Sequence, residues 1–299
     1  MPDHARAWLG LSPRKPAASP ARPAVTASSP GDAAELLRRI TSARYIDNTV
    51  LEVLQNETDA IRLLDRRLGA PAIAAKLEAH MFAHLCDSLR HSLSPQRRAR
   101  LASVLADAAA LAGWQAIDMG RLPAAWAHFE MATAAAREAA DDSLLAFAAG
   151  EQAYVLLDLG QPAQALEKVR AVRVEARTAI PRLLRGWLHA AEAEMAAAAG
   201  QQAACRSALD LAARQVTHSQ ADNALPYLAL DATHLARWRG NCLVQFGDSA
   251  TIADLTGAWP PWTAASPAPR PACAATWPPP CTPQGREPRP AATFPAPAS

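Results

Sequence analysis

The sequence predicts an all-α fold built from stacked antiparallel helical hairpins. Alanine and leucine dominate the 299 residues, whereas tyrosine and phenylalanine, which favour strands, occur only 3 and 5 times. Glycines at positions 120, 160 and 200 recur with a period of forty residues, and each follows a stretch of helical periodicity. Most of the 25 prolines lie near the two ends of the chain, which leaves the centre free to form long helices.

The distribution of proline also predicts the domain organisation. Segments rich in Pro, Ala and Ser cannot bury enough apolar surface to fold, so we expect disordered termini. We expect four regions: a disordered segment at 1–31, N-terminal helices that pack on the repeats at 32–94, the helical repeats at 95–258, and a disordered Pro-rich tail at 259–299.

Two helices are expected before residue 70. A short one runs from Asp32 or Ala33 to about Thr41, and a longer one starts after the N-cap residue Asp47 and ends at Gly69. The longer helix carries a near-heptad apolar stripe that either pairs with a second copy of the chain or packs on the following helix, and packing is favoured. The stripe consists of Leu51, Leu54, Ile61 and Leu68.

Two further helices begin at prolines, which suit the first turn of a helix. The first begins at Pro71 and the second at Ser94 and Pro95. In the helix after Pro71, apolar residues recur at every fourth position, which predicts one buried stripe. Its members are Ile73, Leu77, Met81, Leu85 and Leu89.

Each of the three periodic glycines lies in a constant pattern of small and large residues. Two antiparallel helices joined by a tight turn approach closely only where small residues lie at the crossing, and a larger side chain then fills the space next to it. The small residues come seven positions before and five after the glycine, and the larger ones nine after. They are Gly113, Ala153 and Ala193, then Ala125, Ala165 and Cys205, then Phe129, Val169 and Leu209.

This pattern resembles the tetratricopeptide repeat over about residues 106–215, which implies an α-solenoid of antiparallel helical hairpins. The period of forty exceeds the usual thirty-four or so, so longer helices or longer loops, for instance around Asp141, are expected. A weaker fourth copy includes Gly240 and Gly247, with Ile252 where a small residue is expected.

Residues 33–256 also resemble the C-terminal tetratricopeptide-like domain of helix-turn-helix (XRE-type) transcriptional regulators of high-GC bacteria. The resemblance implies the sensing or protein-interaction part of a regulator. Such regulators usually begin with a DNA-binding domain, which the first thirty residues do not predict. The folded centre also lacks a clustered Lys and Arg stripe, so no direct nucleic-acid contact is expected from this chain. The resemblance rests on Leu63–Ala70, Ala108–Ala116, Glu151–Asp158, Tyr227–Asp231 and His234–Trp238.

The tetratricopeptide resemblance also implies a ligand or peptide groove, lined by the first helix of each hairpin. Aromatic side chains flanked by carboxylates suit an apolar or basic peptide. The alternative, that Trp114, Tyr154 and Trp187 pack between hairpins as core, stays open. The groove positions are Trp114, Asp118, Phe147, Tyr154, Asp158, Trp187, Glu194, His234, Arg237 and Asn241.

No enzyme, metal site or cofactor is expected. His80, His84, Asp87 and His91 share one helical face, but a single helix rarely completes a tetrahedral metal shell, so a solvated or interface stripe is favoured. The five cysteines have no CxxC spacing, and no phosphate loop, nucleophile elbow or zinc-protease motif is present. His189 is a lone histidine for which packing or surface roles are favoured over catalysis.

The function expected is a tetratricopeptide-like protein- or peptide-binding module, the sensing part of a bacterial transcriptional regulator. The sequence shows no signal peptide and no apolar run long enough for a membrane, so a cytoplasmic location without membrane contact is expected. The alternatives are a stand-alone scaffold protein and a non-functional fragment of a frameshifted regulator gene. The fragment alternative is motivated by the Trp-Pro runs from Trp259 onward, whose codons encode helix-forming residues when the reading frame is shifted one base earlier. A natural Pro-rich tail is equally compatible with these runs.

Overall fold

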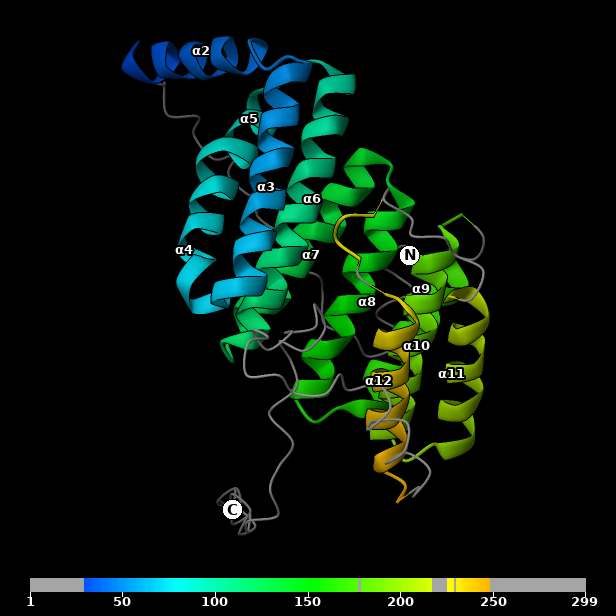
Figure 1. The fold of residues 1–299 in the computed structure, drawn as a ribbon. Helices are drawn as coiled ribbons and strands as arrows, with labels where there is room; N and C mark the ends of the chain where they lie inside the picture. Colours follow the sequence, from blue (N-terminus) through cyan, green and yellow to red (C-terminus); the bar gives the residue numbers. More distant parts are fainter. Residues whose placement is uncertain (1–29, 177–178, 217–224, 229, 248–299) are drawn as a thin grey trace, which may run out of the picture. The chain divides into compact units, whose positions relative to one another are not determined.

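The computed structural model describes residues 30–176, 179–216, 225–228 and 230–247, and these contain helices but no strand (Figure 1). Residues 1–29 of the expected disordered start, the tail from residue 259 and Ile252 lie outside the described residues, whereas Pro30 and Gly31 form the start of α2. In chain order the elements are α2 (Pro30–Arg44), α3 (Asn48–Leu68), α4 (Ala70–His80), the π-helix η1 (Met81–Cys86), α5 (Asp87–His91), α6 (Pro95–Asp118), α7 (Leu122–Ala139), α8 (Asp142–Asp158), α9 (Pro162–Ala176), α10 (Arg182–Ala198), α11 (Gln202–Val216) and α12 (Ala232–Val244).

The chain divides into two compact units, residues 1–38 and 39–299, and the division falls within α2. Of the first unit only the start of α2 is described, where Glu35 and Arg38 form an ion pair of 2.7 Å. All the hairpins described below belong to the second unit.

The boundaries of α3 confirm the prediction from its capping residues. The Asp47 carboxylate accepts a hydrogen bond of 2.9 Å from the backbone N–H of Val50, which satisfies one free donor of the first turn. Gly69 ends the helix at φ 82°. Leu51, Leu54 and Ile61 are buried, whereas Leu68 is 57% exposed and does not continue the buried stripe.

The helix expected after Pro71 is interrupted by the π-helix η1. A strict four-residue repeat drifts by about 40° per step around an α-helix of 3.6 residues per turn, so it leaves one face within a few turns. The wider π turn holds more residues and offsets this drift. All five residues of the predicted stripe are therefore buried, from Ile73 to Leu89.

The three periodic glycines end α6, α8 and α10 in the same backbone conformation. Gly120, Gly160 and Gly200 have φ of 69°, 73° and 72°, in the left-handed region that favours glycine. In each turn the glycine N–H donates to the carbonyl three residues back, and the next N–H donates to the carbonyl five residues back, at 2.8–2.9 Å. This Schellman pair of hydrogen bonds confirms the turns predicted from the period, and Gly247 repeats the positive φ at 70°.

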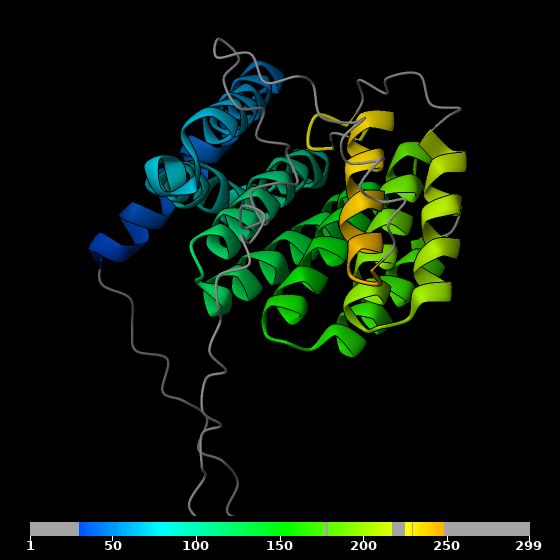
Figure 2. The ribbon, with the colours of Figure 1, turned by 60° about the horizontal axis from the view of Figure 1, so that its bottom comes forward.

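The helices from α6 to α11 form three successive antiparallel hairpins (Figures 1 and 2). Within each pair the two helices pack together, and the second helix also packs on the first helix of the next pair. The first helices contact one another in the order α6, α8, α10 and α12, and we call these four the first-helix row. Only Ala140 and Asp141 separate α7 from α8, so the added length of this repeat lies in its helices.

Small residues allow the close crossing inside each hairpin. A side chain on Gly113 in α6 would lie 2.8 Å from the ring of Phe129 in α7, so only glycine fits there. Ala125, Ala165 and Cys205 are fully buried at the positions predicted for small residues. The larger residues Phe129, Val169 and Leu209 fill the space beside them at 0–1% exposure.

Candidate functional site

The aromatic residues predicted for the groove lie between neighbouring helices of the first-helix row. Trp114 in α6 meets Tyr154 in α8 edge to face, with ring centroids 5.5 Å apart. Phe147 in α8 meets Trp187 in α10 at 5.2 Å. All four are 3–9% exposed, so their rings fill the space between hairpins and provide little open surface.

The chain covers part of this aromatic layer itself. Tyr227, in the described segment 225–228 between α11 and α12, lies with its ring 4.7 Å from that of Phe147. Leu225 and Leu228 on either side of it are buried. Phe147 is therefore covered by the protein's own connection.

Glu194 in α10 joins three helices of the row through one carboxylate oxygen. Its Oε2 accepts a hydrogen bond of 2.9 Å from the Tyr154 hydroxyl in α8 and one of 2.8 Å from the Trp238 indole N–H in α12. The side chain is 7% exposed. A carboxylate at this depth is costly to ionise unless a charge of opposite sign or several donors compensate it.

The environment of Glu194 favours its protonated form. Burial raises the pKa of Glu194 to about 7, although the hydrogen bonds from Tyr154 and Trp238 act in the opposite direction. The nearby Asp158 carboxylate raises this pKa further. Asp158, at the solvent-contacting end of α8, has its own pKa raised by partial desolvation. Glu194 therefore exchanges its proton near neutral pH.

The remaining predicted groove residues keep contact with solvent. Asp118 and Asp158 lie at the same position, two residues before the turn glycines of α6 and α8. In α12, His234, Arg237 and Asn241 are half-buried. When α12 is aligned through the turn glycine Gly247, His234 corresponds to Phe147 and Trp187, and Asn241 corresponds to Tyr154 and Glu194, all of which are buried. No described hairpin follows α12, so this face of the helix is only partly covered.

A second buried polar cluster joins α3 to the first-helix row. The Arg62 guanidinium of α3 forms a very short ion pair with the Asp107 carboxylate of α6, and another of 3.1 Å with Asp59. Gln55 also donates to Asp107, at 3.1 Å. Burial holds the pKa of Glu151 in α8 well above its ordinary value, since Arg62 offsets only part of that cost.

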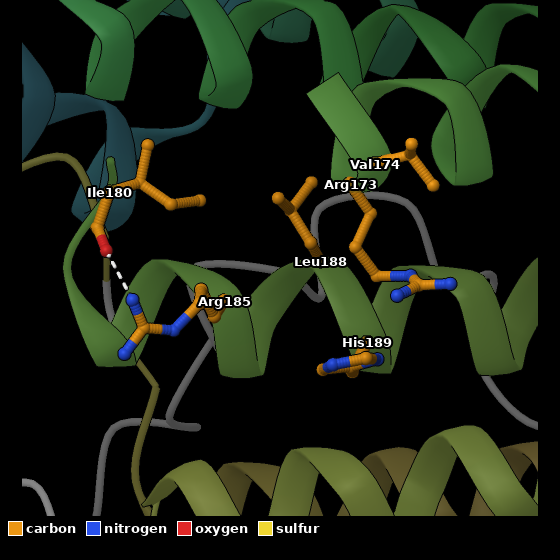
Figure 3. A pocket seen from close by; sticks show the side chains of 6 residues that line it. All are labelled: Arg173, Val174, Ile180, Arg185, Leu188 and His189. Atoms are coloured by element: carbon orange, nitrogen blue, oxygen red, sulfur yellow. Dashed lines mark hydrogen bonds between the residues drawn. The ribbon is translucent and has the colours of Figure 1, made fainter. Parts of the chain in front are cut away.

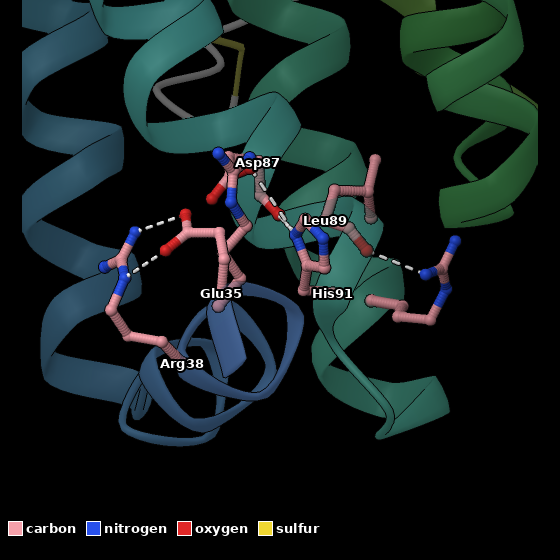
Figure 4. A network of polar contacts seen from close by, with 7 residues as sticks. Glu35, Arg38, Asp87, Leu89 and His91 are labelled. Carbon is pink, nitrogen blue, oxygen red and sulfur yellow. Dashed lines mark hydrogen bonds and ion pairs between the residues drawn. The ribbon is translucent and has the colours of Figure 1, made fainter. Parts of the chain in front are cut away.

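The histidine stripe after Pro71 does not gather in one place. His80 is 2% exposed and bonds Thr58 of α3 at 3.0 Å, whereas His84 is exposed. Asp87 pairs with Arg39 at 2.8 Å, and the Nδ1 of His91 lies 2.8 Å from the Asp87 carbonyl oxygen (Figure 4). Within the described ranges, no three His, Cys, Asp or Glu side chains are placed to hold a metal ion.

A pocket of about 330 Å³ lies between α9 and α10, and none of the predicted groove residues lines it (Figure 3). Sequence reasoning gave no indication of it, because its residues are spread over two helices and a connection and carry no motif. Arginine, histidine and aliphatic side chains line it together: Arg173, Val174, Ile180, Arg185, Leu188 and His189.

Sequence reasoning also missed Trp238 and Glu151 as interacting residues. Trp238 follows a predicted groove residue by one position, and the register of the weaker fourth copy did not single it out. Glu151 lies three residues before Tyr154, in the stretch 150–155 of α8 where every position is buried. A charged residue in such an apolar stretch is the signal that could have identified it.

No protein-family model matches the chain, and neither a curated protein nor a solved structure matches it. Among the helices that the structure describes, none combines the length and apolar character needed to cross a bilayer.

Proposed function

We propose that the described hairpins form a tetratricopeptide-like solenoid that binds a protein or peptide, and that this module is the sensing part of a bacterial transcriptional regulator. The repeated Schellman turns, the small residues at each crossing and the contacts along the first-helix row support the solenoid. The regulator assignment rests on the resemblance of residues 33–256 described above. A cytoplasmic location belongs to the same proposal.

The observation that carries the binding proposal is the Glu194 carboxylate with Asp158 beside it. Asp158 contacts solvent, and Glu194 lies deeper, held by Tyr154 and Trp238. The other charge that acts on the pKa of Glu194 is the negative Asp158. A cationic side chain of a partner would supply the missing charge.

A peptide selection tests this proposal. A random peptide library displayed on phage is selected on the full chain and on the double variant Asp118→Asn/Asp158→Asn. A second double variant, Glu167→Gln/Glu175→Gln, removes the same charge from the exposed face of α9 and is the matched control. We expect enrichment of Lys- or Arg-containing peptides on the wild type and the control, and loss of that enrichment on the Asn variant.

The same selection separates the proposal from a scaffold that uses other surfaces. A scaffold would enrich the same peptides on the wild type and on the Asn variant. Far-UV circular dichroism of each variant shows whether the helices are intact, since both carboxylates lie near helix ends and their replacement should not unfold the protein.

We further propose that two copies pair through the outer face of α3. Val53, Leu64 and Leu68 lie within one face of this helix and are 37–60% exposed, and an exposed apolar stripe of this kind marks an interface. The small residue Ala60 lies at its middle, where two helices can approach. Glu52 lies near the start and Arg67 near the end, so an antiparallel pair places opposite charges together.

Sedimentation equilibrium of the full chain tests this pairing. Val53→Lys/Leu64→Lys should give a monomer, whereas Leu93→Lys, at an exposed leucine after α5, should not change the mass. Arg67→Glu should weaken the dimer, and adding Glu52→Arg should restore it. A wild type that stays monomeric, or a charge-reversed pair no better than the single variant, would contradict the pairing.

A further inference from the structure

The pocket between α9 and α10 has an apolar wall. Ile180 and Leu188 are buried, at 3% and 0% exposure, and Val174 lies at its exposed edge. Its volume of about 330 Å³ is at the lower end of the range of roughly 300–1,000 Å³ that ligand pockets occupy. The space suits a small molecule or the end of a chain, and not a folded partner.

The other walls of the pocket are cationic. The two arginines that line it are drawn at its opposite ends in Figure 3, where the Arg185 Nη1 donates to the Ile180 carbonyl oxygen at 2.8 Å. The Nε of Arg173 pairs with one oxygen of Glu192 at 2.8 Å, and the Nε of Arg170 pairs with the other at 2.8 Å. The single negative charge of Glu192 is thus shared by two guanidinium groups, and Arg185 adds a further positive charge.

His189 places a polar group without a partner against this cationic surface. The residue is 8% exposed, and its Nδ1 makes no hydrogen bond. The nearest carboxylate oxygen, Oε2 of Glu192, lies 3.9 Å away, beyond hydrogen-bonding distance. Burial lowers the pKa of His189, and the positive charges of Arg173, Arg214 and Arg185 lower it further, against the effect of Glu192.

We infer that this pocket binds a small aliphatic carboxylate. The carboxylate group of the ligand would accept hydrogen bonds from Arg185 and from His189. It would thereby supply the acceptor and the negative charge that this part of the pocket lacks. The aliphatic part would lie along Ile180, Leu188 and Val174. This site is separate from the proposed peptide surface, so either can fail without the other.

The test is a titration of the full chain with straight-chain carboxylates from acetate to octanoate and with the corresponding amides. The readout is the NMR resonance of the His189 ring, assigned by its loss in His189→Gln. Affinity should rise about fourfold with each added methylene until the pocket is full. The amides should bind at least tenfold more weakly, and the carboxylates should move the pKa of His189 upward.

Two variants of equal charge locate the binding. Arg185→Gln should weaken carboxylate binding at least tenfold, while Arg182→Gln, at an exposed arginine in the same helix, should leave it unchanged. Three outcomes would overturn the inference: equal losses in the two variants, amides that bind as well as carboxylates, or inorganic phosphate that displaces octanoate at equal concentration.

Discussion

At the scale of single residues, the backbone conformation of the turns has a measurable consequence. Ala140 ends α7 at φ 54°, where a non-glycine residue is strained, and its side chain is exposed. We predict that Ala140→Gly stabilises the protein by about 0.5–1 kcal/mol. Gly160→Ala, at φ 73° with open space around it, should destabilise it by about 1 kcal/mol. Urea unfolding measures both, and equal signs for the two would contradict the argument.

The crossing of α6 and α7 depends on one contact. A methyl group on Gly113 would overlap the ring of Phe129, which is fully buried and cannot move aside freely. We predict that Gly113→Ala costs about 1–3 kcal/mol. In the double variant Gly113→Ala/Phe129→Leu the second change should cost less than it does alone, and strictly additive effects in urea unfolding would contradict the contact.

The carboxyl group of Glu194 makes stability depend on pH. Its pKa is about 7 in the folded protein against 4.5 for an ordinary glutamate, so the folded state binds the proton more tightly. The contribution of the Glu194 proton to the free energy of unfolding is therefore fully present below pH 4.5 and is lost as the pH rises through about 7. We predict that Glu194→Gln is more stable than the wild type at pH 8 but not at pH 4.5. Between these two pH values, the difference in free energy of unfolding between variant and wild type should change by on the order of 3 kcal/mol.

The control for this prediction is Glu175→Gln, which replaces an exposed glutamate on α9. Urea unfolding of the three proteins between pH 4.5 and 8 gives the comparison. A difference between wild type and Glu194→Gln that stays constant with pH would contradict a proton held at Glu194.

At the scale of the helices, α3 is attached to the first-helix row through buried charge. Arg62 is 6% exposed and pairs with Asp107, while the Glu151 carboxyl lies close by. Removal of one partner of a buried ion pair leaves the other uncompensated, so we predict that Arg62→Met costs about 3–5 kcal/mol. Adding Asp107→Asn should recover part of that loss in urea unfolding. No recovery would show that Arg62 acts through packing alone.

The capping and turn signals made the helix boundaries predictable. Asp47, Gly69 and the periodic glycines act within a few residues of their own backbone, so their effects can be read from the sequence. The π-helix was not predicted, although the four-residue spacing from Ile73 to Leu89 contained the signal. Around an ordinary α-helix that spacing drifts by about 40° per step, so five buried residues at this spacing require a wider turn.

At the scale of the whole molecule, the all-helical class followed from composition and period, but the environment of the predicted groove residues did not. Spacing places Trp114, Tyr154 and Glu194 on equivalent faces of successive helices. Whether such a face is open depends on how closely the next hairpin stacks and on connections such as the segment with Tyr227. Both depend on contacts between residues far apart in the chain.

Partner binding should also release protons if a cation of the partner reaches Asp158 and Glu194. A positive charge beside these groups lowers their pKa values, and both are raised in the free protein. Calorimetric titrations at pH 7 in two buffers of different ionisation enthalpy should therefore give different binding enthalpies. Equal enthalpies in the two buffers would mean that the partner does not approach these carboxyl groups.

The most direct test of the proposed binding surface is the affinity of one selected basic peptide for three forms of the full chain. By isothermal titration calorimetry, Asp118→Asn/Asp158→Asn should bind it at least tenfold more weakly than the wild type, and Glu167→Gln/Glu175→Gln should bind it equally well. Equal affinities for all three forms would contradict a partner site on the first-helix row.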